Sequence, residues 1–578
     1  MSRLYCGDIT NSLINQEVLV YGWVKKNRKL GSLVFLDISD RSGLVQVVVL
    51  ENNNFFNLAK NLKRESVVAI TGIVNKKETP NNLYPNGDIE IQLTDLKVLS
   101  VSETTPLIIE NNTDALEEIR MKYRFLDLRR PLMQQNLFFR SKVVNALRQF
   151  LVNNGFIDVE TPILGKPTPE GARDYLVPSR VHYGKFYALP QSPQIYKQLL
   201  MVSGFDRYFQ IARCFRDEDL RSDRQPEFTQ LDMELSFCNE LQIQTLVEQL
   251  IQYIFKETLN VDIKIPFIRM NYIDAVNTYG SDKPDLRFDL KLIDATDYFK
   301  NTTLDLFKQA KAKNEVIKAI VVDQVLDKKI INELEKYAKD MKAKGLAYII
   351  YDGTELKGPI SNYLDINLVK EFLLQNNCTT GTILLVVDKL KIVNDALGLV
   401  RNVLADKLGL KQKNNFQFLW IVNWPLFEYN EEEKQYLPAH HPFTQPQDEF
   451  HNTFDKDKAN ALAKAYDIVL NGYELGGGSI RITDPEMQTR MFNAIGLSAD
   501  EINTKFGYLI NAFKYGVPPH GGLAIGIDRL ISLMLNLDNI KDVIAFPKNS
   551  NAYDQMLEAP SVTNSKELFE LGINWDKK

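Results

Sequence analysis

The sequence predicts a multidomain α+β protein, in which a small N-terminal β-barrel precedes a larger domain of sheet and helices that an inserted α+β domain interrupts. The chain has 578 residues, which is the length of several domains rather than one. Its first part alternates short strand-like runs with turns. From residue 287 to about residue 412 lysine becomes abundant, and segments rich in candidate site residues resume after Trp420.

Five short runs rich in Val, Ile and Leu predict the barrel. They cover residues 17–24, 32–40, 44–50, 66–76 and 89–100. One helical stretch, residues 55–64, lies between the third and fourth runs. Five strands with a helix in that position favour an OB-type barrel, although any other small β-barrel remains open. We place this domain at residues 1–104.

A basic stripe follows the first predicted strand, at Lys25, Lys26, Arg28 and Lys29. Phe35 lies on the next strand. An aromatic side chain flanked by cations suits the stacking of unpaired nucleic-acid bases. The alternative is that Phe35 belongs to the barrel core.

A polar hinge at residues 104–112 leads into a second domain, whose first predicted helix covers residues 134–153. Leu137, Val144, Leu147 and Leu151 recur there at helical spacing, and Gly155 is a suitable C-cap. Helix-like runs at residues 304–318 and 330–343 fall in the lysine-rich stretch, where nothing looks catalytic. We therefore expect domain parts at residues 105–285, 286–416 and 417–578, of which the middle one is the insertion.

Composition limits the class of protein. Hydrophobic residues make up 44% and charged residues 25%, which excludes a disordered or collagen-like chain. Lys and Arg number 69 against 74 Asp and Glu, so the net charge of −5 excludes a chain coated in positive charge. The sequence has no apolar run near the roughly 18 residues that span a bilayer, and no signal core. We expect a cytoplasmic protein that binds no membrane.

The four cysteines, Cys6, Cys214, Cys238 and Cys378, lie far apart in the sequence. They form no CxxC pair and no Cys/His spacing typical of zinc, so we expect reduced thiols and no zinc. The pair His440-His441 has no Cys or Glu at ligand spacing and is expected first to be structural.

The densest group of charges lies in residues 205–234, where two strand-like segments flank a loop rich in Arg, Asp and Glu. Arg216 closes the first of these strands, and an arginine fixed there can hold a phosphate through its bidentate fork. A solvated hairpin tip is the alternative.

Two further segments are candidates for the same site. In residues 520–534 a glycine-rich strand leads through Gly526 and Arg529 into an apolar helix, so that a flat ligand could approach the backbone, although close strand–helix packing also explains the glycines. Residues 465–482 are typical of a hairpin and carry Asp467, Glu474 and Arg481. Carboxylates beside a phosphate site usually hold Mg²⁺, and a salt-bridged role is the alternative.

Together these segments resemble the class II aminoacyl-tRNA synthetases of the Asp/Asn/Lys subgroup, and among them the bacterial-type aspartyl family. Residues 155–164, 209–232 and 521–530 are similar to motifs 1, 2 and 3 of that class. The combination of TPEGARDY, LPQSPQ, FRDEDLRSDRQPEF, AHHPF and YELGGGSIRI is more specific than motif 3 alone. The resemblance implies an OB-fold anticodon-binding domain, a catalytic antiparallel sheet with helices, a GAD-like inserted domain, and a homodimer formed through motif 1.

The same resemblance implies the activity of an aspartate–tRNA ligase. ATP would activate L-aspartate to an adenylate with release of pyrophosphate, Mg²⁺ would assist, and aspartate would pass to the 3′-terminal adenosine of tRNA(Asp). The implied aspartate-binding residues are Glu170, Gln194, Lys197, Arg216, Asp232, His440 and Arg481. The implied ATP-binding residues are Arg216, Asp217, Glu218, Gln225, Phe228, Glu474, Gly526, Ile527, Asp528 and Arg529, of which Arg216, Glu218 and Arg529 are expected to be catalytic. Asp467 and Glu474 would bind the metal, and Arg28, Leu30, Phe35 and Gln46 would contact the anticodon.

Three other functions compete with this one. An asparaginyl- or lysyl-tRNA synthetase is the nearest, but the Arg481 and Lys197 pair suits a second carboxylate. A non-catalytic OB-fold paralogue would be expected to lose ATP-site residues that are present here. An asparagine synthetase with the same catalytic fold would have no use for the barrel. Leu30 stands where relatives that also charge tRNA(Asn) tend to have His, which predicts a discriminating enzyme, and Pro167 departs from the family pattern in the loop that carries Glu170.

Overall fold

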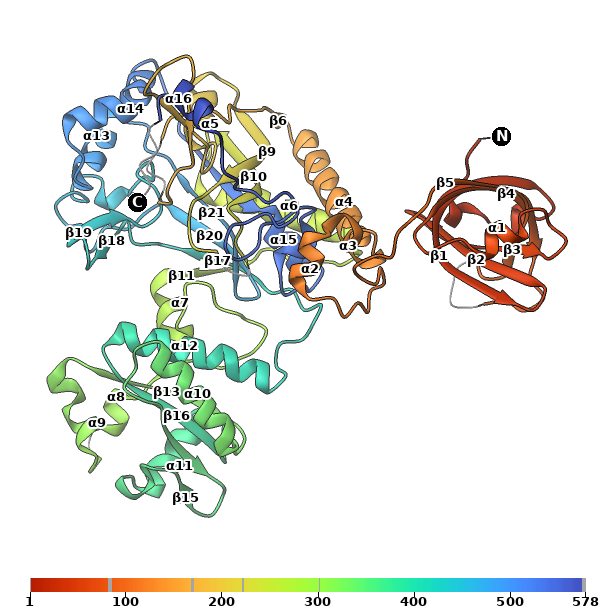
Figure 1. Ribbon diagram of the computed structural model, residues 1–578. Helices are drawn as coiled ribbons and strands as arrows, with labels where there is room; N and C mark the ends of the chain where they lie inside the picture. Colours follow the sequence, from red (N-terminus) through yellow and green to blue (C-terminus); the bar gives the residue numbers. More distant parts are fainter. Residues whose placement is uncertain (1, 82–85, 168–170, 221–222, 301, 574–578) are drawn as a thin grey trace. The chain divides into compact units, whose positions relative to one another are not determined.

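The computed structural model describes residues 2–81, 86–167, 171–220, 223–300 and 302–573. The chain forms two compact units, one made of residues 1–136 with 554–559 and the other of residues 137–553 with 560–578. Figure 1 shows the barrel of the first unit and the sheets of the second. In the described ranges no helix is long and apolar enough to cross a membrane.

The N-terminal strands close into a barrel in the order β1-β2-β3-β5-β4. The strands are β1 (Glu17–Leu30), β2 (Leu33–Asp40), β3 (Gly43–Leu50), β4 (Val67–Lys76) and β5 (Ile89–Ser100), with α1 (Phe56–Lys60) between β3 and β4. Every second side chain in the first half of β1 is buried, as the alternation of apolar residues requires. The five predicted strands and the OB-type barrel are therefore confirmed. The first strand is longer than predicted, so the basic stripe lies on the second half of β1 and not after it.

Helix α1 is shorter than the predicted 55–64. The Asn27 side-chain amide donates to the backbone oxygens of Ala59, Lys60 and Leu62. The carbonyl groups at the end of this short helix are therefore satisfied by a neighbouring strand rather than by a further helical turn.

The second unit contains an eight-stranded sheet in the order β11-β17-β20-β21-β22-β10-β9-β6. Its strands are β6 (Ile157–Asp158), β9 (Arg207–Phe215), β10 (Glu227–Ser236), β11 (Ile268–Asn271), β17 (Phe418–Val422), β20 (Ala465–Leu470), β21 (Tyr473–Ile480) and β22 (His520–Gly526). The six inner strands are antiparallel, but both edge strands pair in parallel, β11 with β17 and β6 with β9. The predicted antiparallel sheet is thus mixed at its edges. Long connections, residues 159–206 between β6 and β9 and residues 272–417 between β11 and β17, return the chain in the same direction, as parallel pairing requires.

Three helices and this sheet share one core. Val143, Leu147 and Leu151 of α4 (Pro131–Asn153) pack in it together with apolar residues of α6 (Glu240–Leu259) and α15 (Ile527–Met534). Helix α4 includes the predicted helix 134–153 and starts three residues earlier. The predicted turn from β22 through Gly526 into α15 is also present.

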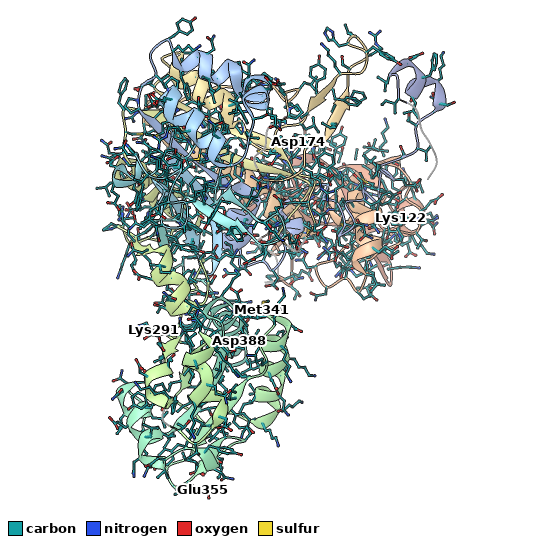
Figure 2. All side chains as sticks on the ribbon, turned by 90° about the vertical axis from the view of Figure 1, so that its left-hand side faces the viewer. Lys122, Asp174, Lys291, Met341, Glu355 and Asp388 are labelled. Atoms are coloured by element: carbon teal, nitrogen blue, oxygen red, sulfur yellow. The ribbon has the colours of Figure 1, made fainter. Side chains whose placement is uncertain are left out.

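The inserted segment builds a five-stranded sheet in the order β12-β13-β16-β14-β15. Its strands are β12 (Ile293–Asp294), β13 (Val316–Val322), β14 (Ala347–Tyr351), β15 (Leu356–Lys357) and β16 (Gly381–Asp388), and its helices are α8 (Thr296–Phe299), α9 (Asp305–Ala310), α10 (Lys328–Asp340), α11 (Ile366–Gln375) and α12 (Leu390–Lys407). In Figure 2, Met341 and Asp388 lie toward one end of this domain and Glu355 at the other.

The predicted helix 304–318 is wrong beyond its first part. Helix α9 ends at Ala310 and a 3₁₀ turn ends at Lys313. Asn314 then adopts a left-handed backbone with φ of 57°, and β13 begins at Val316. The β-branched residues from Val316 onward favour a strand over the helix that the preceding lysines and alanines suggested.

A buried arginine ties the entry of the inserted segment to its last helix. Arg401 of α12 donates to the backbone oxygens of Asp285, Phe288 and Leu290, at 2.8 and 3.0 Å for the first two. Its guanidinium also lies over the Phe288 ring, 4.1 Å from the centroid.

The remaining elements connect these sheets. They are the helices α2 (Glu117–Lys122), α3 (Arg124–Asp127), α5 (Gln194–Val202), α7 (Tyr272–Tyr279), α13 (Pro485–Ala494), α14 (Ala499–Phe513) and α16 (Ser565–Glu570), and the strands β7 (Leu176–Pro178), β8 (Phe186–Ala188), β18 (Phe427–Asn430) and β19 (Gln435–Pro438). Helix α5 contacts β9 and β10, which places its first residues beside the centre of the eight-stranded sheet.

Candidate active site

A cavity of about 330 Å³ opens over the middle of the eight-stranded sheet and brings together residues from distant parts of the chain. The candidate residues that line it are Gln194, Lys197, Arg216, Glu218, Gln225, Phe228, Asp232, His440, Asp467, Glu474, Arg481, Gly526, Asp528 and Arg529. One site is thus formed by residues from three segments that lie far apart in the sequence, 205–234, 465–482 and 520–534.

Three candidates stand apart from the lining. Glu170 lies outside the described residues. Asp217 is held by its backbone, whose N–H donates to the carbonyl of Arg173 at 3.1 Å. The Ile527 side chain is fully buried in the core below the cavity, so only its backbone could face a ligand.

One end of the cavity carries two arginines with unused donors. Arg216 follows β9 directly, and its guanidinium lies 5.1 Å from the centroid of the Phe228 ring. Arg529 donates to the backbone oxygen of Glu474 and, at 3.0 Å, to Asp223. The Nε atoms of both arginines are buried without a partner in the described ranges. Buried donors are normally satisfied, so this end suits an anionic ligand.

Two residues at this end of the cavity bind other parts of the protein. The Gln225 amide exchanges two hydrogen bonds with the backbone of Lys548, at 3.1 and 2.7 Å. Asp528 accepts from the Thr229 N–H at 2.9 Å and pairs with Arg140. Asp528 therefore fixes α15 to β10, and its carboxylate is not free for a ligand.

A pair of carboxylates lies beside the two arginines. Asp467 on β20 stands opposite Gly477 on β21, and a Cβ at that glycine would lie 2.3 Å from the Asp467 Oδ1. Burial, with the charge of Glu474 nearby, raises the pKa of Asp467 well above its usual range. Its Oδ1 has no partner among the described residues, so a cation would relieve both the repulsion and the missing contact.

These two carboxylates fit a magnesium ion only with help from other ligands. No group of three or more His, Cys, Asp or Glu that could hold a metal occurs in the described part of the chain. Mg²⁺ is commonly bound by one or two carboxylates together with water and substrate phosphates. The pair is therefore suited to a magnesium ion that a phosphate-bearing ligand also coordinates.

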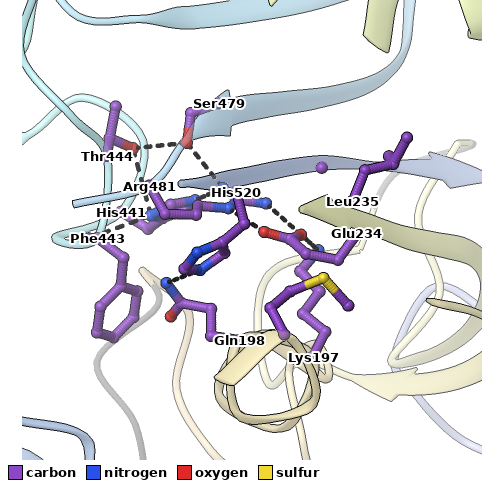
Figure 3. A network of polar contacts seen from close by, with 12 residues as sticks. Lys197, Gln198, Glu234, Leu235, His441, Phe443, Thr444, Ser479, Arg481 and His520 are labelled. Atoms are coloured by element: carbon purple, nitrogen blue, oxygen red, sulfur yellow. Dashed lines mark hydrogen bonds and ion pairs between the residues drawn. The ribbon is translucent and has the colours of Figure 1, made fainter. Parts of the chain in front are cut away.

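The other end of the cavity contains a buried network of charges (Figure 3). Arg481 and Glu234 form a bidentate pair, with Nε–Oε1 at 2.8 Å and Nη2–Oε2 at 3.0 Å. Lys197 donates to Asp232 at 2.7 Å and lies 3.3 Å from Glu234. A Cβ at Gly522 would lie 2.0 Å from the Glu234 Oε2, so this glycine makes room for the carboxylate.

Burial and neighbouring charges set the protonation of this network. Burial alone would raise the pKa of Glu234, but Arg481 and Lys197 lower it to about 2. Burial raises the pKa of Asp232, which keeps one oxygen without a partner among the described residues. A ligand with an ammonium and a carboxylate could use that oxygen and the two cations.

Both histidines of the pair reach this end and are neutral. Burial and Arg481 lower the pKa of His440 to about 4, and its ring lies 4.8 Å from that of Trp424. The same causes hold the pKa of His441 well below its usual range, and Arg481 lies 2.6 Å from its Nε2.

Four residues that hold Arg481, directly or through another side chain, were not predicted from the sequence, namely Glu234, His441, Thr444 and Ser479. Glu234 could have been found, because it follows Asp232 by two positions on a strand and so faces the same way. Ser479 could have been found in the same way, because it precedes Arg481 by two positions at the end of β21. No local signal marks His441 and Thr444, which meet Arg481 through the pairing of the 440–444 segment with the residue that follows β21.

The candidate nucleic-acid residues share the outer face of the barrel. Phe35 is half-buried, stands opposite Arg28 and Val48, and is not part of the barrel core. Gln46 stands opposite Asp37, which accepts from Arg28 at 2.8 Å. Leu30 is 63% exposed.

A second cavity, of about 190 Å³, opens on the same face of the barrel. It is lined by Lys26, Arg28, Asp37, Leu44, Gln46, Lys77, Asn81, Asn86 and Gly87. Three of these side chains are cationic, so the hollow offers charge-assisted donors next to the aromatic ring.

Comparison with known families and structures agrees with this geometry. Residues 116–550 match the family of class II tRNA synthetases (D, K and N), and residues 18–99 match the OB-fold nucleic acid binding domain. An aspartate–tRNA ligase of Malacoplasma penetrans is 54% identical over 576 residues, and one of Ureaplasma parvum is 52% identical over 578 residues. Each alignment covers 99% of both chains.

Solved structures show the same fold at low identity. Asparaginyl-tRNA synthetase from Pyrococcus horikoshii, complexed with asparaginyl-adenylate, has a TM-score of 0.61 at 20% identity and covers 95% of this chain and 98% of its own. Aspartyl-tRNA synthetase from Entamoeba histolytica has a TM-score of 0.58 at 18% identity, covering 95% and 92%.

Proposed function

The chain belongs to the class II tRNA synthetases of the D, K and N group, and on that premise we propose that it is an aspartate–tRNA ligase. It joins L-aspartate to ATP, forming aspartyl-adenylate and pyrophosphate, and then transfers aspartate to the 3′-terminal adenosine of tRNA(Asp). The observation that supports this proposal most strongly is the cavity that offers Lys197 and Arg481 at one end and Arg216 and Arg529 at the other.

The arginine end suits ATP. Arg216 holds the α-phosphate and the substrate carboxylate through its unused donors, with Glu218 beside it. Phe228 and Arg529 enclose the adenine, and Gly526 allows it to approach the backbone. Asp467 and Glu474 would hold Mg²⁺, which when bound neutralises charge on the phosphates of ATP.

The charged network suits aspartate. The free oxygen of Asp232 receives the α-ammonium group, with Glu170 as the candidate second acceptor. Lys197 and Arg481 receive the side-chain carboxylate, and Gln194 and His440 border it. Asparagine would place an amide NH₂ group, which cannot accept a hydrogen bond, against one of these two donors. Mismatches of this kind between buried polar groups discriminate by roughly 10⁴-fold or more.

The chemistry requires no protein nucleophile. The α-carboxylate of aspartate attacks the α-phosphorus in line, and pyrophosphate leaves. The terminal ribose hydroxyl of the tRNA then attacks the mixed anhydride and releases AMP. Arg216 and Arg529 act by holding the reacting groups and stabilising the charge that develops on the phosphate.

We propose that the barrel binds the anticodon. Arg28, Phe35 and Gln46 share one outer face, where a ring can stack on an unpaired base and the cations can meet phosphates. Leu30 supports charging of tRNA(Asp) without tRNA(Asn). This proposal includes a domain assignment, with the anticodon-binding part at residues 1–104, the catalytic parts at residues 105–285 and 417–578, and the inserted part at residues 286–416. It also includes a homodimer formed through residues 155–164 and a cytoplasmic location.

The proposal is tested in two steps with the full-length chain. ATP–pyrophosphate exchange is measured with aspartate, asparagine and lysine, and only aspartate should support it efficiently. Aminoacylation is then measured with tRNA(Asp) and tRNA(Asn) transcripts, and only the first should be charged. Preferred activation of asparagine or lysine would refute the proposed substrate, and charging of both transcripts would refute the proposed tRNA specificity alone.

A further inference from the structure

The guanidinium of Arg481 has five N–H donors, and the chain itself uses four of them. Nε and one N–H of Nη2 donate to Glu234. Nη1 donates to the His441 Nε2 at 2.6 Å and to the Ser479 Oγ at 2.7 Å. Counted over the described residues, a single N–H, on Nη2, is left for a ligand.

The contact with Arg481 fixes the tautomer of His441. Arg481 can only donate, so the His441 Nε2 must accept, and the ring proton therefore resides on Nδ1. Nδ1 lies 3.3 Å from the Thr444 Oγ1, to which it donates. The backbone N–H of Phe443 lies at a similar distance from Nδ1 but cannot donate to a nitrogen that carries a proton.

Thr444 and Ser479 complete a closed ring of hydrogen bonds (Figure 3). The Thr444 hydroxyl donates to the Ser479 Oγ at 3.3 Å, and that oxygen also accepts from Arg481. Thr444 is 2% and Ser479 1% exposed, so water does not compete for these groups. A backbone bridge between Thr444 and Arg481 holds the two sides of the ring together.

We infer that His441, Thr444 and Ser479 are positioning residues, which hold Arg481 so that the one remaining N–H of Nη2 faces the side chain of the substrate. The inference rests on the proposed function. Among the described residues, Lys197 likewise has one of its three N–H donors left after its contacts with Asp232 and Glu234. The site therefore presents two single donors, one from each cation, which match the two oxygens of a carboxylate.

The ring contributes orientation rather than charge. Glu234 already neutralises Arg481, and the three ring partners are uncharged. An arginine side chain loses much of its rotamer freedom when it is fixed, and that loss opposes binding. If the ring fixes it before substrate binds, that loss does not weaken the binding of aspartate, and the Nη2 donor stays within reach.

The test uses hydroxyl deletions in the full-length enzyme. Ser479→Ala removes an oxygen that contacts Arg481. Thr444→Val removes an oxygen that contacts His441 and Ser479. Thr444→Ser keeps the hydroxyl. Thr489→Val is the matched control, because its hydroxyl donates to the Pro485 backbone in α13, away from the site. ATP–pyrophosphate exchange gives kcat and KM separately for aspartate and ATP, and melting temperatures are recorded for every variant.

We expect the KM for aspartate to rise about tenfold in Ser479→Ala, which loses a hydrogen bond to a charged group. We expect a smaller rise, of about fivefold, in Thr444→Val, which loses hydrogen bonds between uncharged groups. The kcat and the KM for ATP should stay within about twofold, and Thr444→Ser and Thr489→Val should resemble the wild type. An unchanged KM for aspartate in both deletion variants, or an equal rise in the KM for ATP, would overturn the inference. A wild-type enzyme that does not activate aspartate would refute the proposed function instead.

Discussion

Replacing Glu234 by Gln should destabilise the second unit strongly while changing few atoms. Glu234 is fully buried and accepts two hydrogen bonds from Arg481 and an ionic contact from Lys197. The substitution keeps the size of the side chain but removes its charge. Two buried cations then share only Asp232, and removing one partner of a buried ion pair typically costs about 3–5 kcal/mol.

The pKa of Glu234 gives an independent magnitude. It falls from 4.5 to about 2 in the folded protein. At about 1.4 kcal/mol for each pKa unit, this corresponds to roughly 3 kcal/mol of stability. Because the folded-state pKa is the lower one, this contribution is present above pH 4.5 and is lost as the pH falls toward 2. The difference between the wild type and Glu234→Gln should therefore be constant near neutral pH and narrow below about pH 4.5.

Urea unfolding at pH 7, 5 and 4 measures the difference, with Glu227→Gln as the control. Glu227 lies on the same strand and pairs with Arg213 and Lys548, but its side chain is 34% exposed. An exposed pair of this kind contributes at most about 1 kcal/mol. If Glu234→Gln lost no more stability than Glu227→Gln at pH 7, the buried ion pairs of Glu234 would contribute no more than exposed ones, and the reasoning from burial would fail.

Three further predictions concern activity. Arg216→Ala and Arg529→Ala should each abolish ATP–pyrophosphate exchange, because each removes buried donors that no other described side chain replaces. Phe35→Ala should raise the KM for tRNA(Asp) about tenfold in aminoacylation and leave pyrophosphate exchange unchanged, since one base–aromatic stack contributes about 1–3 kcal/mol. Gly522→Ala should raise the KM for aspartate. The added Cβ would lie 2.0 Å from the Glu234 Oε2 and would displace that carboxylate from Arg481. Isothermal titration with aspartate would detect the change as weaker binding.

Matched variants separate these effects from general damage. Arg213→Ala removes an arginine from β9, the strand that ends just before Arg216, and this variant should retain exchange activity. Ile73→Ala removes an exposed apolar side chain from β4 of the barrel and should leave the KM for tRNA unchanged. Equal losses in a variant and its control would contradict the corresponding assignment.

Much of the fold could be predicted because it follows from local patterns. The alternation of apolar residues in β1 and the spacing of Leu147 and Leu151 in α4 follow directly from strand and helix geometry. Local patterns mislead at residues 311–318, where lysines and alanines of high helix propensity run into the β-branched start of β13. Pairing with β16 decides the outcome there, and that contact is not local.

The candidate site was predictable in its members but not in its internal contacts. Motif residues such as Arg216 and Arg481 carry a recognisable pattern, and the structure brings both to one cavity. The partner of Arg481 is set by strand register, which places Glu234 opposite Gly522 across β10 and β22. Register depends on the whole sheet, so the sequence alone could not show that the described partners of Arg481 leave it one donor for a ligand.

The buried Arg401 has a consequence for the order of folding. Glu234 and Arg481 are 247 positions apart, and the inserted segment occupies a large part of that interval. Closing a long loop costs conformational entropy that grows with its length. Arg401 joins the start of the inserted segment to its final helix, so once that segment has folded, the loop between Glu234 and Arg481 is effectively shorter. We therefore expect the inserted segment to fold before β10 and β21 meet, which gives this segment a role in the assembly of the site.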